Sequence, residues 1–163
     1  YEIYQCDWSS DVCSSDLWFF LIQPKFIPEN FIAKDPKTWL NYCLKKWSGG
    51  FNFKGIEKYY LKYFKNYKRI HSSCEDYRAG ASIDLVHDKK DLKKKLHIPL
   101  QVLWGKNGRV GKKFKPLKVW QKYTTQKVEG KGFNCKHFIA EEAPKQTLNE
   151  MQKFFLKYSD FNY

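Results

Sequence analysis

Between residues 35 and 82 the apolar positions recur every three or four residues, the spacing of helices that bury one face. Asp35-Pro36 predicts a helix start, because an Asp side chain caps the first free amides and Pro fits the first turn. Ser48-Gly49-Gly50 predicts the end of that helix, and two further helices are predicted at residues 56–67 and 69–82. No strand pattern interrupts this stretch, so we expect a helical layer whose aromatic residues are mostly core.

The residues before this layer are predicted to be less regular. Residues 18–22 are strongly apolar and predict the tail of a helix. Pro24 and Pro28 follow, and proline breaks a helix interior because it lacks the amide hydrogen and clashes with the preceding turn. We therefore expect an extended link after residue 22.

After a lysine run within residues 89–95 the pattern changes to alternating strands and helices. Residues 98–104 and 126–133 are predicted strands, and residues 116–123 and 140–158 are predicted helices. This order predicts a parallel sheet with right-handed crossovers. Two strands do not form a stable sheet alone, so either the chain dimerises or half of the domain is missing. The last predicted helix carries an apolar stripe of Leu148, Met151, Phe155 and Tyr158.

The composition is that of a folded protein. With 163 residues the chain has the size of one ordinary domain, and 18% of its residues are aromatic, more than a disordered chain carries. The net charge of +13 suggests a nucleic-acid partner, because basic side chains neutralise phosphates. Only three of the 30 basic residues are Arg, the residue that reads guanine and stacks on bases. We therefore interpret the lysines as a solvated surface and expect no nucleic-acid partner.

The sequence shows neither a membrane-spanning pattern nor a secretory signal. No run of about 18 apolar residues is present, and the first residues lack a basic region followed by an apolar stretch. The five cysteines, an odd number, have no CxxC or other metal-ligand spacing. We expect a cytoplasmic protein with reduced thiols, no bound metal and no membrane partner.

Residues 1–17 differ from the rest of the chain. They contain the Ser/Asp tract DWSSDVCSSDL and no lysine, whereas lysine is abundant elsewhere. The tract resembles the translation of a common sequencing adapter, so we predict that residues 1–17 are artefactual and leave them out of the fold prediction. The alternative is a genuine acidic tail, whose serines lack the glycine-flanked turn of a nucleophile.

His137 lies in the predicted loop between the second strand and the last helix. A side chain at that position often points into a cleft, because ligands bind at the carboxyl ends of parallel strands. The alternative is a surface histidine that only hydrogen-bonds its neighbours.

Four segments together resemble the haloacetate (fluoroacetate) dehalogenases, a subgroup of the α/β-hydrolases. In chain order they read WFFLIQPKFIPEN from Trp18, HSSCEDYRAGASIDLVHD from His71, PLQVLWG from Pro99 and CKHFIAEEAPKQT from Cys135. The resemblance implies an α/β fold that is the C-terminal part of an α/β-hydrolase. A helical cap at residues 18–84 would precede the last two strand–helix units of a parallel sheet, at residues 85–163.

The resemblance implies a hydrolase that cleaves the carbon–halogen bond of haloacetates, which are small haloacids, without a cofactor. In this family an Asp displaces the halide to give an ester, and a His base then activates the water that hydrolyses the ester. His137 matches that base. Lys136 stands beside it where the family usually has Gly, and a lysine pointing inward there would disfavour the imidazolium.

The resemblance also implies a site for the halide and the substrate. Trp18 and Tyr77 match the tryptophan and tyrosine whose polar hydrogens stabilise the departing halide. Trp47 matches a cap tryptophan near the substrate pocket. Leu17 stands where the histidine partner of Trp18 is expected. The alternative for these aromatic residues is ordinary packing.

No segment of the chain matches the Asp nucleophile, the substrate-binding arginines or the orienting acid of this family. Many α/β-hydrolases place the acid after the strand at residues 98–104, where this chain has Asn107. We therefore expect this chain to be inactive by itself. An epoxide hydrolase of the same fold, a noncatalytic relative and a basic nucleic-acid-binding module are the alternatives. Homodimers are common in the family, so a second copy is a candidate partner.

Overall fold

The computed structural model describes residues 12–159, and for residues 12–16 only the course of the backbone helix is described. Residues 1–11, most of the segment predicted to be artefactual, lie outside the described residues. The chain forms two compact units. The first unit comprises the described residues up to Cys43 and Phe53–Asp91. The second comprises Leu44–Asn52, which lies inside the predicted cap range, and the described residues from Leu92 onward.

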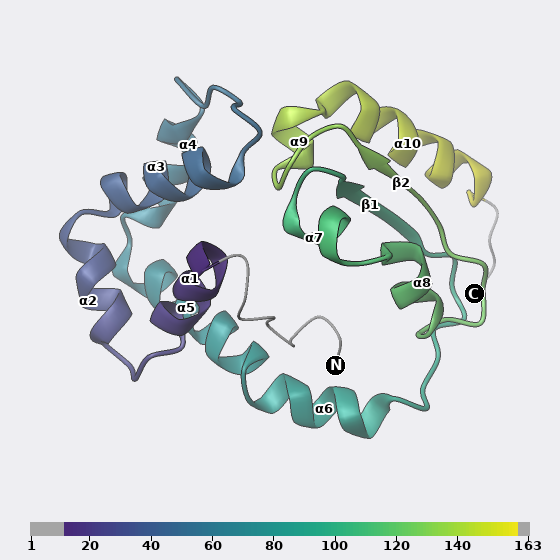
Figure 1. Ribbon diagram of the computed structural model, residues 1–163, viewed down its shortest axis with the longest axis horizontal. Coiled ribbons are helices and arrows are strands. Elements are labelled where there is room, and N and C mark those ends of the chain that lie inside the picture. The colour runs from purple at the N-terminus through teal and green to yellow at the C-terminus, as the bar shows by residue number, and fades with distance from the viewer. Residues whose placement is uncertain (1–11, 160–163) are drawn as a thin grey trace. The chain divides into compact units, whose positions relative to one another are not determined.

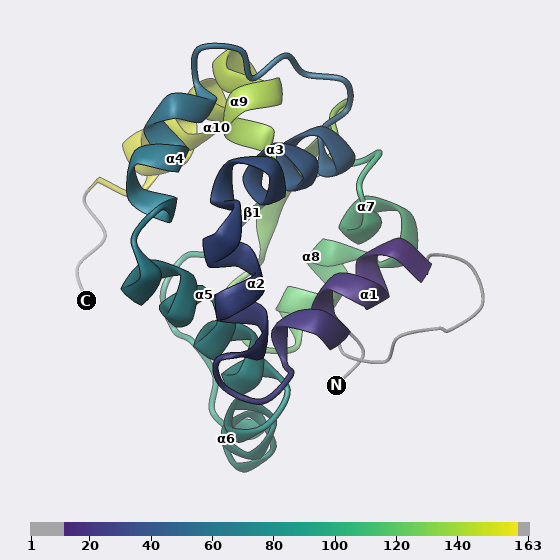
Figure 2. The ribbon, with the colours of Figure 1, turned by 90° about the vertical axis from the view of Figure 1, so that its left-hand side faces the viewer.

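The first unit is helical and is built around helix α5 (Figure 1). Helix α5 contacts α1, α2, α4 and α6, and Figure 2 shows α2 running alongside it. A buried core cluster of Leu21, Ile32, Ile70 and Cys74 joins helices α1, α2 and α5. The helices of this unit are α1 (Val12–Leu21), α2 (Ile27–Lys34), α3 (Pro36–Trp47, whose last turn belongs to the second unit), α4 (Glu57–Phe64), α5 (Tyr67–Gly80) and α6 (Ile83–Asp91).

The predicted start of α3 is confirmed, because the Thr38 amide donates to Asp35 Oδ1 at 3.0 Å and Pro36 is the first helical residue. The predicted extended link is wrong, since residues 27–34 form helix α2. Pro28 lies in the first turn of that helix, where a missing amide hydrogen leaves no bond unmade. The left-handed backbone of Phe26, with φ of 76°, separates α2 from α1.

The helix predicted at residues 56–67 ends earlier than expected. Asn66 caps the next helix instead, because its side chain accepts a hydrogen bond from the Lys68 amide at 2.9 Å. Helix α5 therefore begins at Tyr67, two residues before the predicted start. Helix α6, which covers the charged segment after it, was not predicted.

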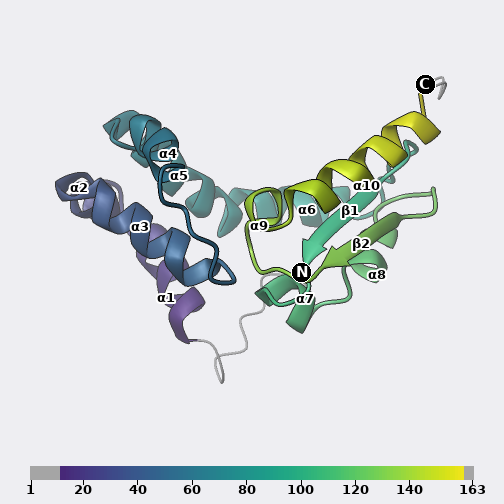
Figure 3. The same cartoon turned by 90° about the horizontal axis from the view of Figure 1, so that it is seen from above.

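The second unit contains a two-stranded parallel sheet, which confirms the predicted strand order. Strand β1 (Gln101–Gly105) pairs with β2 (Glu129–Phe133) in a register that runs from Gln101 opposite Glu129 to Gly105 opposite Phe133. Figure 3 shows α10 on one side of the strand pair and α7 and α8 on the other. The helices of this unit are α7 (Arg109–Lys113), α8 (Pro116–Gln121), α9 (Ile139–Glu142) and α10 (Pro144–Lys157).

The last predicted helix is divided in two at Ala143. Its backbone (φ −141°, ψ 51°) is not helical, because a residue before proline is driven out of the helical region, and Pro144 follows. Ala143 packs in a small buried cluster with Phe133 and Cys135 at the end of the sheet. Three residues of the predicted apolar stripe on α10 are exposed: Leu148, Met151 and Phe155.

Among the helices of the described residues, none combines the length and the apolar character needed to span a membrane. Cys43, Cys74 and Cys135 are buried free thiols.

Candidate active site

His137 lies where the carboxyl ends of the two parallel strands meet. The loop after β1 is bonded to the loop after β2, because the Lys106 amide donates to the Phe133 carbonyl at 2.8 Å and the Asn107 amide donates to the Cys135 carbonyl at 3.0 Å. A side chain at Gly105 would collide with the backbone of Lys136, so a glycine there permits this close approach. The two loops therefore present His137 at the edge of the sheet where open α/β sheets bind ligands.

Two aromatic rings crowd the imidazole of His137. The ring of Trp47 lies 5.5 Å from it, centroid to centroid, and the ring of Phe138 lies 5.0 Å from it, both edge to face. The His137 amide also donates to the Trp47 carbonyl at 3.3 Å. Trp47 is carried by residues 44–52 of the same unit, so the structure brings together these two predicted site residues.

The surroundings of His137 favour its neutral form. The residue remains accessible to solvent, but partial desolvation of the crowded ring lowers its pKa below the ordinary 6.5. The charges of Glu142 and Glu141 act in the opposite direction and are the smaller effect. Within the described residues the imidazole nitrogens make no hydrogen bond. A neutral imidazole with a free nitrogen can accept a proton from water.

The carboxylate of Glu142 binds three backbone amides around His137. Its Oε2 accepts from the Gly49 amide at 2.7 Å and from the Lys136 amide at 3.0 Å, and its Oε1 accepts from the Phe138 amide at 2.9 Å. Glu142 lies in the segment CKHFIAEEAPKQT that resembles the dehalogenases, but no role was predicted for it. Its position five residues after a candidate base is too weak a signal to assign one.

Trp18 and Tyr77, the residues predicted to bind halide, are in contact in the first unit. Trp18 on α1 and Tyr77 on α5 meet edge to face, with ring centroids 5.0 Å apart. Both are half-buried. Burial, followed by the charges of Cys43 and Asp76, raises the pKa of Tyr77, so its hydroxyl stays protonated and able to donate at neutral pH.

Two positions that depart from the hydrolase pattern have packing or hydrogen-bonding roles. Leu17, which stands where a histidine partner of Trp18 was expected, packs against the core cluster of the first unit. Asn107, which stands where many hydrolases have an acid, donates its side-chain amide to Asn134 Oδ1 at 2.8 Å.

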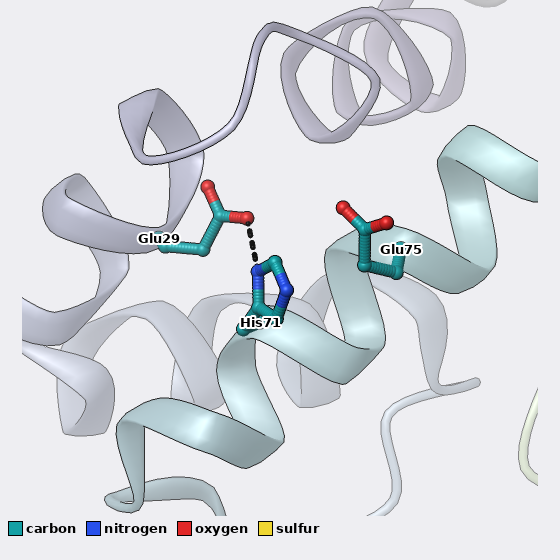
Figure 4. A group of neighbouring side chains, drawn as sticks. All are labelled: Glu29, His71 and Glu75. Atoms are coloured by element: carbon teal, nitrogen blue, oxygen red, sulfur yellow. Dashed lines mark hydrogen bonds and ion pairs between the residues drawn. The ribbon is translucent and has the colours of Figure 1, made fainter.

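A second polar cluster, in the first unit, has the residue types of a metal site. Glu29, His71 and Glu75 each offer a ligand atom within 4.8 Å of the others (Figure 4). The Arg78 guanidinium, however, already binds both oxygens of Glu29, at 2.8 and 3.1 Å, and Oε1 of Glu75 at 2.6 Å. A cation would have to displace this guanidinium, so the arrangement fits an ion-pair network better than a metal site.

The ion-pair network fastens α2 to α5. The side chain of Glu29 is completely buried, and His71 Nδ1 lies 2.9 Å from its Oε1. Burial alone would raise the pKa of Glu29, but the hydrogen bonds from Arg78 and His71 outweigh burial and lower it to about 2. Glu29 is therefore a buried charged residue that binds α5, the helix that carries Tyr77, through His71 and Arg78.

The first unit also has an open apolar hollow of about 380 Å³, lined by Leu40, Tyr59, Tyr60, Tyr63, Phe64 and Arg69. No predicted site residue lines it, and its walls carry no candidate nucleophile or base.

Comparison with known proteins gives matches along most of the chain. No protein-family profile matches it. A fluoroacetate dehalogenase from Burkholderia sp. is 32% identical over 141 residues, which are 84% of this chain and 46% of the relative. The chain thus spans about half the length of this curated relative.

Solved structures match over a similar span. A candidate acyltransferase from Salmonella enterica gives a TM-score of 0.81 at 35% identity, over 88% of this chain and 48% of that one. A candidate α/β-hydrolase from Nostoc sp. PCC 7120 gives 0.79 at 39% identity, over 87% and 49%. A candidate epoxide hydrolase from Pseudomonas aeruginosa gives 0.79 at 30% identity, over 90% and 50%.

Proposed function

We propose that this chain, which has the fold of the C-terminal part of an α/β-hydrolase, supplies the base and the halide-binding residues of a haloacetate dehalogenase. The fold class expected from the sequence is confirmed by the parallel strand pair and by the matched structures. The substrate class and the residue roles are the proposal. The observation that carries it is His137, a partly desolvated imidazole crowded by Trp47 at the carboxyl ends of two parallel strands.

The proposed reaction has two displacements. The nucleophile is an Asp carboxylate to which no segment of this chain corresponds. It attacks the halogen-bearing carbon, so that a carbon–oxygen bond forms and the halide leaves with the bonding electrons. His137 then removes a proton from water, and the hydroxide attacks the ester carbonyl. The hydroxyacid leaves, the Asp is regenerated, and the proton on His137 returns to solvent.

The contact between Trp18 and Tyr77 supports halide as the leaving group. The indole N–H and the phenol O–H are two neutral donors, and the rings that carry them lie in contact. Donors fixed in a half-dry setting stabilise a departing anion far better than water does. The raised pKa of Tyr77 keeps its hydroxyl in the donating form.

An epoxide hydrolase is the second candidate, favoured by the match to the Pseudomonas structure. The same base would serve it, because its ester intermediate is hydrolysed in the same way. Epoxide opening needs donors on an alkoxide oxygen, which two tyrosines usually provide, and the pair here is a tryptophan and a tyrosine.

A chimera tests the proposal. Residues 18–163 are joined to the part of the Burkholderia dehalogenase that has no counterpart in this chain. We expect the chimera to release fluoride from fluoroacetate, His137→Asn to abolish turnover, and the control His87→Asn, on the exposed helix α6, to retain it. The 163-residue chain alone is expected to release no halide. A folded chimera that hydrolyses styrene oxide but not fluoroacetate would establish the epoxide alternative.

A further inference from the structure

Both oxygens of the Glu142 carboxylate accept hydrogen bonds from backbone amides around the candidate base. Two of the amides that it binds, those of Lys136 and Phe138, belong to the residues on either side of His137. One acceptor group therefore fixes the chain immediately before and after the histidine. This limits the rotation of the backbone that aims the imidazole, because a charged acceptor holds an amide more firmly than a neutral one does.

The third amide comes from a distant part of the sequence. Gly49 is 93 residues away from Glu142 and lies two residues after Trp47, whose ring contacts His137. A Cβ at Gly49 would lie 2.7 Å from Glu142 Oε2, so only glycine lets the amide approach this closely without displacing the carboxylate. Glu142 therefore ties the segment that carries Trp47 to the loop that carries His137.

The neighbouring residue Glu141 provides the comparison. Both carboxylates belong to helix α9, and both raise the pKa of His137 by their charge. Glu142, in addition, accepts the amides on both sides of the histidine. A purely electrostatic role would be shared by the two residues, whereas a geometric role would belong to Glu142.

We propose that Glu142 is a positioning residue that holds His137 and Trp47 in one fixed arrangement through their backbone. Within the described residues its carboxylate makes no hydrogen bond to the imidazole itself. Its importance for catalysis rests on the proposed function of His137 as the base. We call the three hydrogen bonds from Gly49, Lys136 and Phe138 to Glu142 the clamp. The clamp is a property of the folded chain and can be measured without any turnover.

Amide hydrogen exchange in the 163-residue chain tests the clamp. In Glu142→Gln either the Phe138 amide or the Gly49 and Lys136 amides must face an amide donor, so we expect exchange on that side of the side chain to accelerate about tenfold or more, the factor that about one such hydrogen bond supplies. Glu141→Gln, the matched control, should leave these three rates within about threefold. Amides of the β1–β2 ladder report global stability in both variants.

A second variant covers the case in which Glu142→Gln does not fold. Gly49→Ala leaves the carboxylate in place but pushes Oε2 away from its amides, so exchange at Lys136 should also accelerate while Phe138, bound to Oε1, changes less. If Glu142→Gln and Glu141→Gln give the same exchange rates at Gly49, Lys136 and Phe138, the positioning role is wrong.

The chimera separates this inference from the proposed function. Glu142→Gln in an active chimera should lower kcat for fluoroacetate about tenfold and leave KM nearly unchanged, because the base and not the substrate contacts are misplaced. An inactive chimera whose chain still shows the clamp by exchange would refute the proposed function alone. An active chimera with an unchanged kcat in Glu142→Gln would refute the catalytic importance of the clamp.

Discussion

Replacing Glu29 by Gln should destabilise the first unit by about 3 kcal/mol. The carboxylate of Glu29 is completely buried and is bonded to the Arg78 guanidinium through both oxygens. Gln keeps the size of the side chain but removes its charge. Arg78, whose side chain is only 15% exposed, would then keep a single charged partner, Glu75.

The pKa of Glu29 and the burial of its ion pair with Arg78 both give that magnitude. The pKa of Glu29 is lowered from 4.5 to about 2, and each unit of lowering corresponds to about 1.4 kcal/mol of preference for the charged folded form. Breaking a buried ion pair by removing one partner typically costs about 3–5 kcal/mol. The remaining bond from Arg78 to Glu75 places the expected loss at the lower end of that range.

The assay is urea unfolding followed by circular dichroism at pH 7, with Glu75→Gln as the control. Glu75 binds the same guanidinium, but its side chain is 37% exposed, so its loss should cost clearly less than the loss of Glu29. If the two variants differ by less than about 1 kcal/mol, Glu29 is not the residue that fastens α2 to α5.

Acidification provides an independent check on the cause. Because the pKa of Glu29 is lowered on folding, its stabilising contribution is fully present above about pH 4.5 and is lost as the pH falls toward 2. The difference between the wild-type chain and Glu29→Gln should therefore shrink between pH 5 and pH 3. A difference that stays constant over this range would refute the electrostatic explanation.

Two further predictions concern the site. NMR titration should give His137 a pKa below 6.5, and Trp47→Ala should raise this pKa toward 6.5 by exposing the imidazole. An unchanged pKa in Trp47→Ala would show that Trp47 does not desolvate the imidazole. In the chimera, Tyr77→Phe should slow fluoride release about 100-fold, because it removes one hydrogen-bond donor to the halide. The control Tyr59→Phe, at an exposed position, should not slow it. Equal rates in the two variants would show that Tyr77 does not bind the halide.

The sequence predicted those elements whose signals are local. The start of α3 was found because Asp35 and Pro36 act on the adjacent turn, and strand β1 was found because it lies in a short, mostly apolar run. Helix α2 was missed because Pro28 was interpreted as a helix breaker, although a proline in the first turn is compatible with a helix. The boundary between α4 and α5 was predicted two to three residues too late, because the capping role of Asn66 was not recognised.

The site was less predictable from the residues alone. The family resemblance selected His137, Trp18, Tyr77 and Trp47, but the contact between Trp47 and His137 depends on a fold that joins segments about 90 residues apart. Glu142 could not be assigned from its position, because its function depends on which backbone amides surround it. A carboxylate in the first turn of a helix has many ordinary roles, such as stabilising the helix by interacting with the positive end of its dipole.

Single-turnover kinetics of the His137→Asn chimera test most directly whether His137 is the base of the ester-hydrolysing step. We expect a burst of one fluoride for each active site, then no further release, and a covalent ester on the Asp nucleophile detectable by mass spectrometry. Continuous turnover by the His137→Asn chimera, or loss of the first fluoride as well as the later ones in a folded protein, would contradict that role.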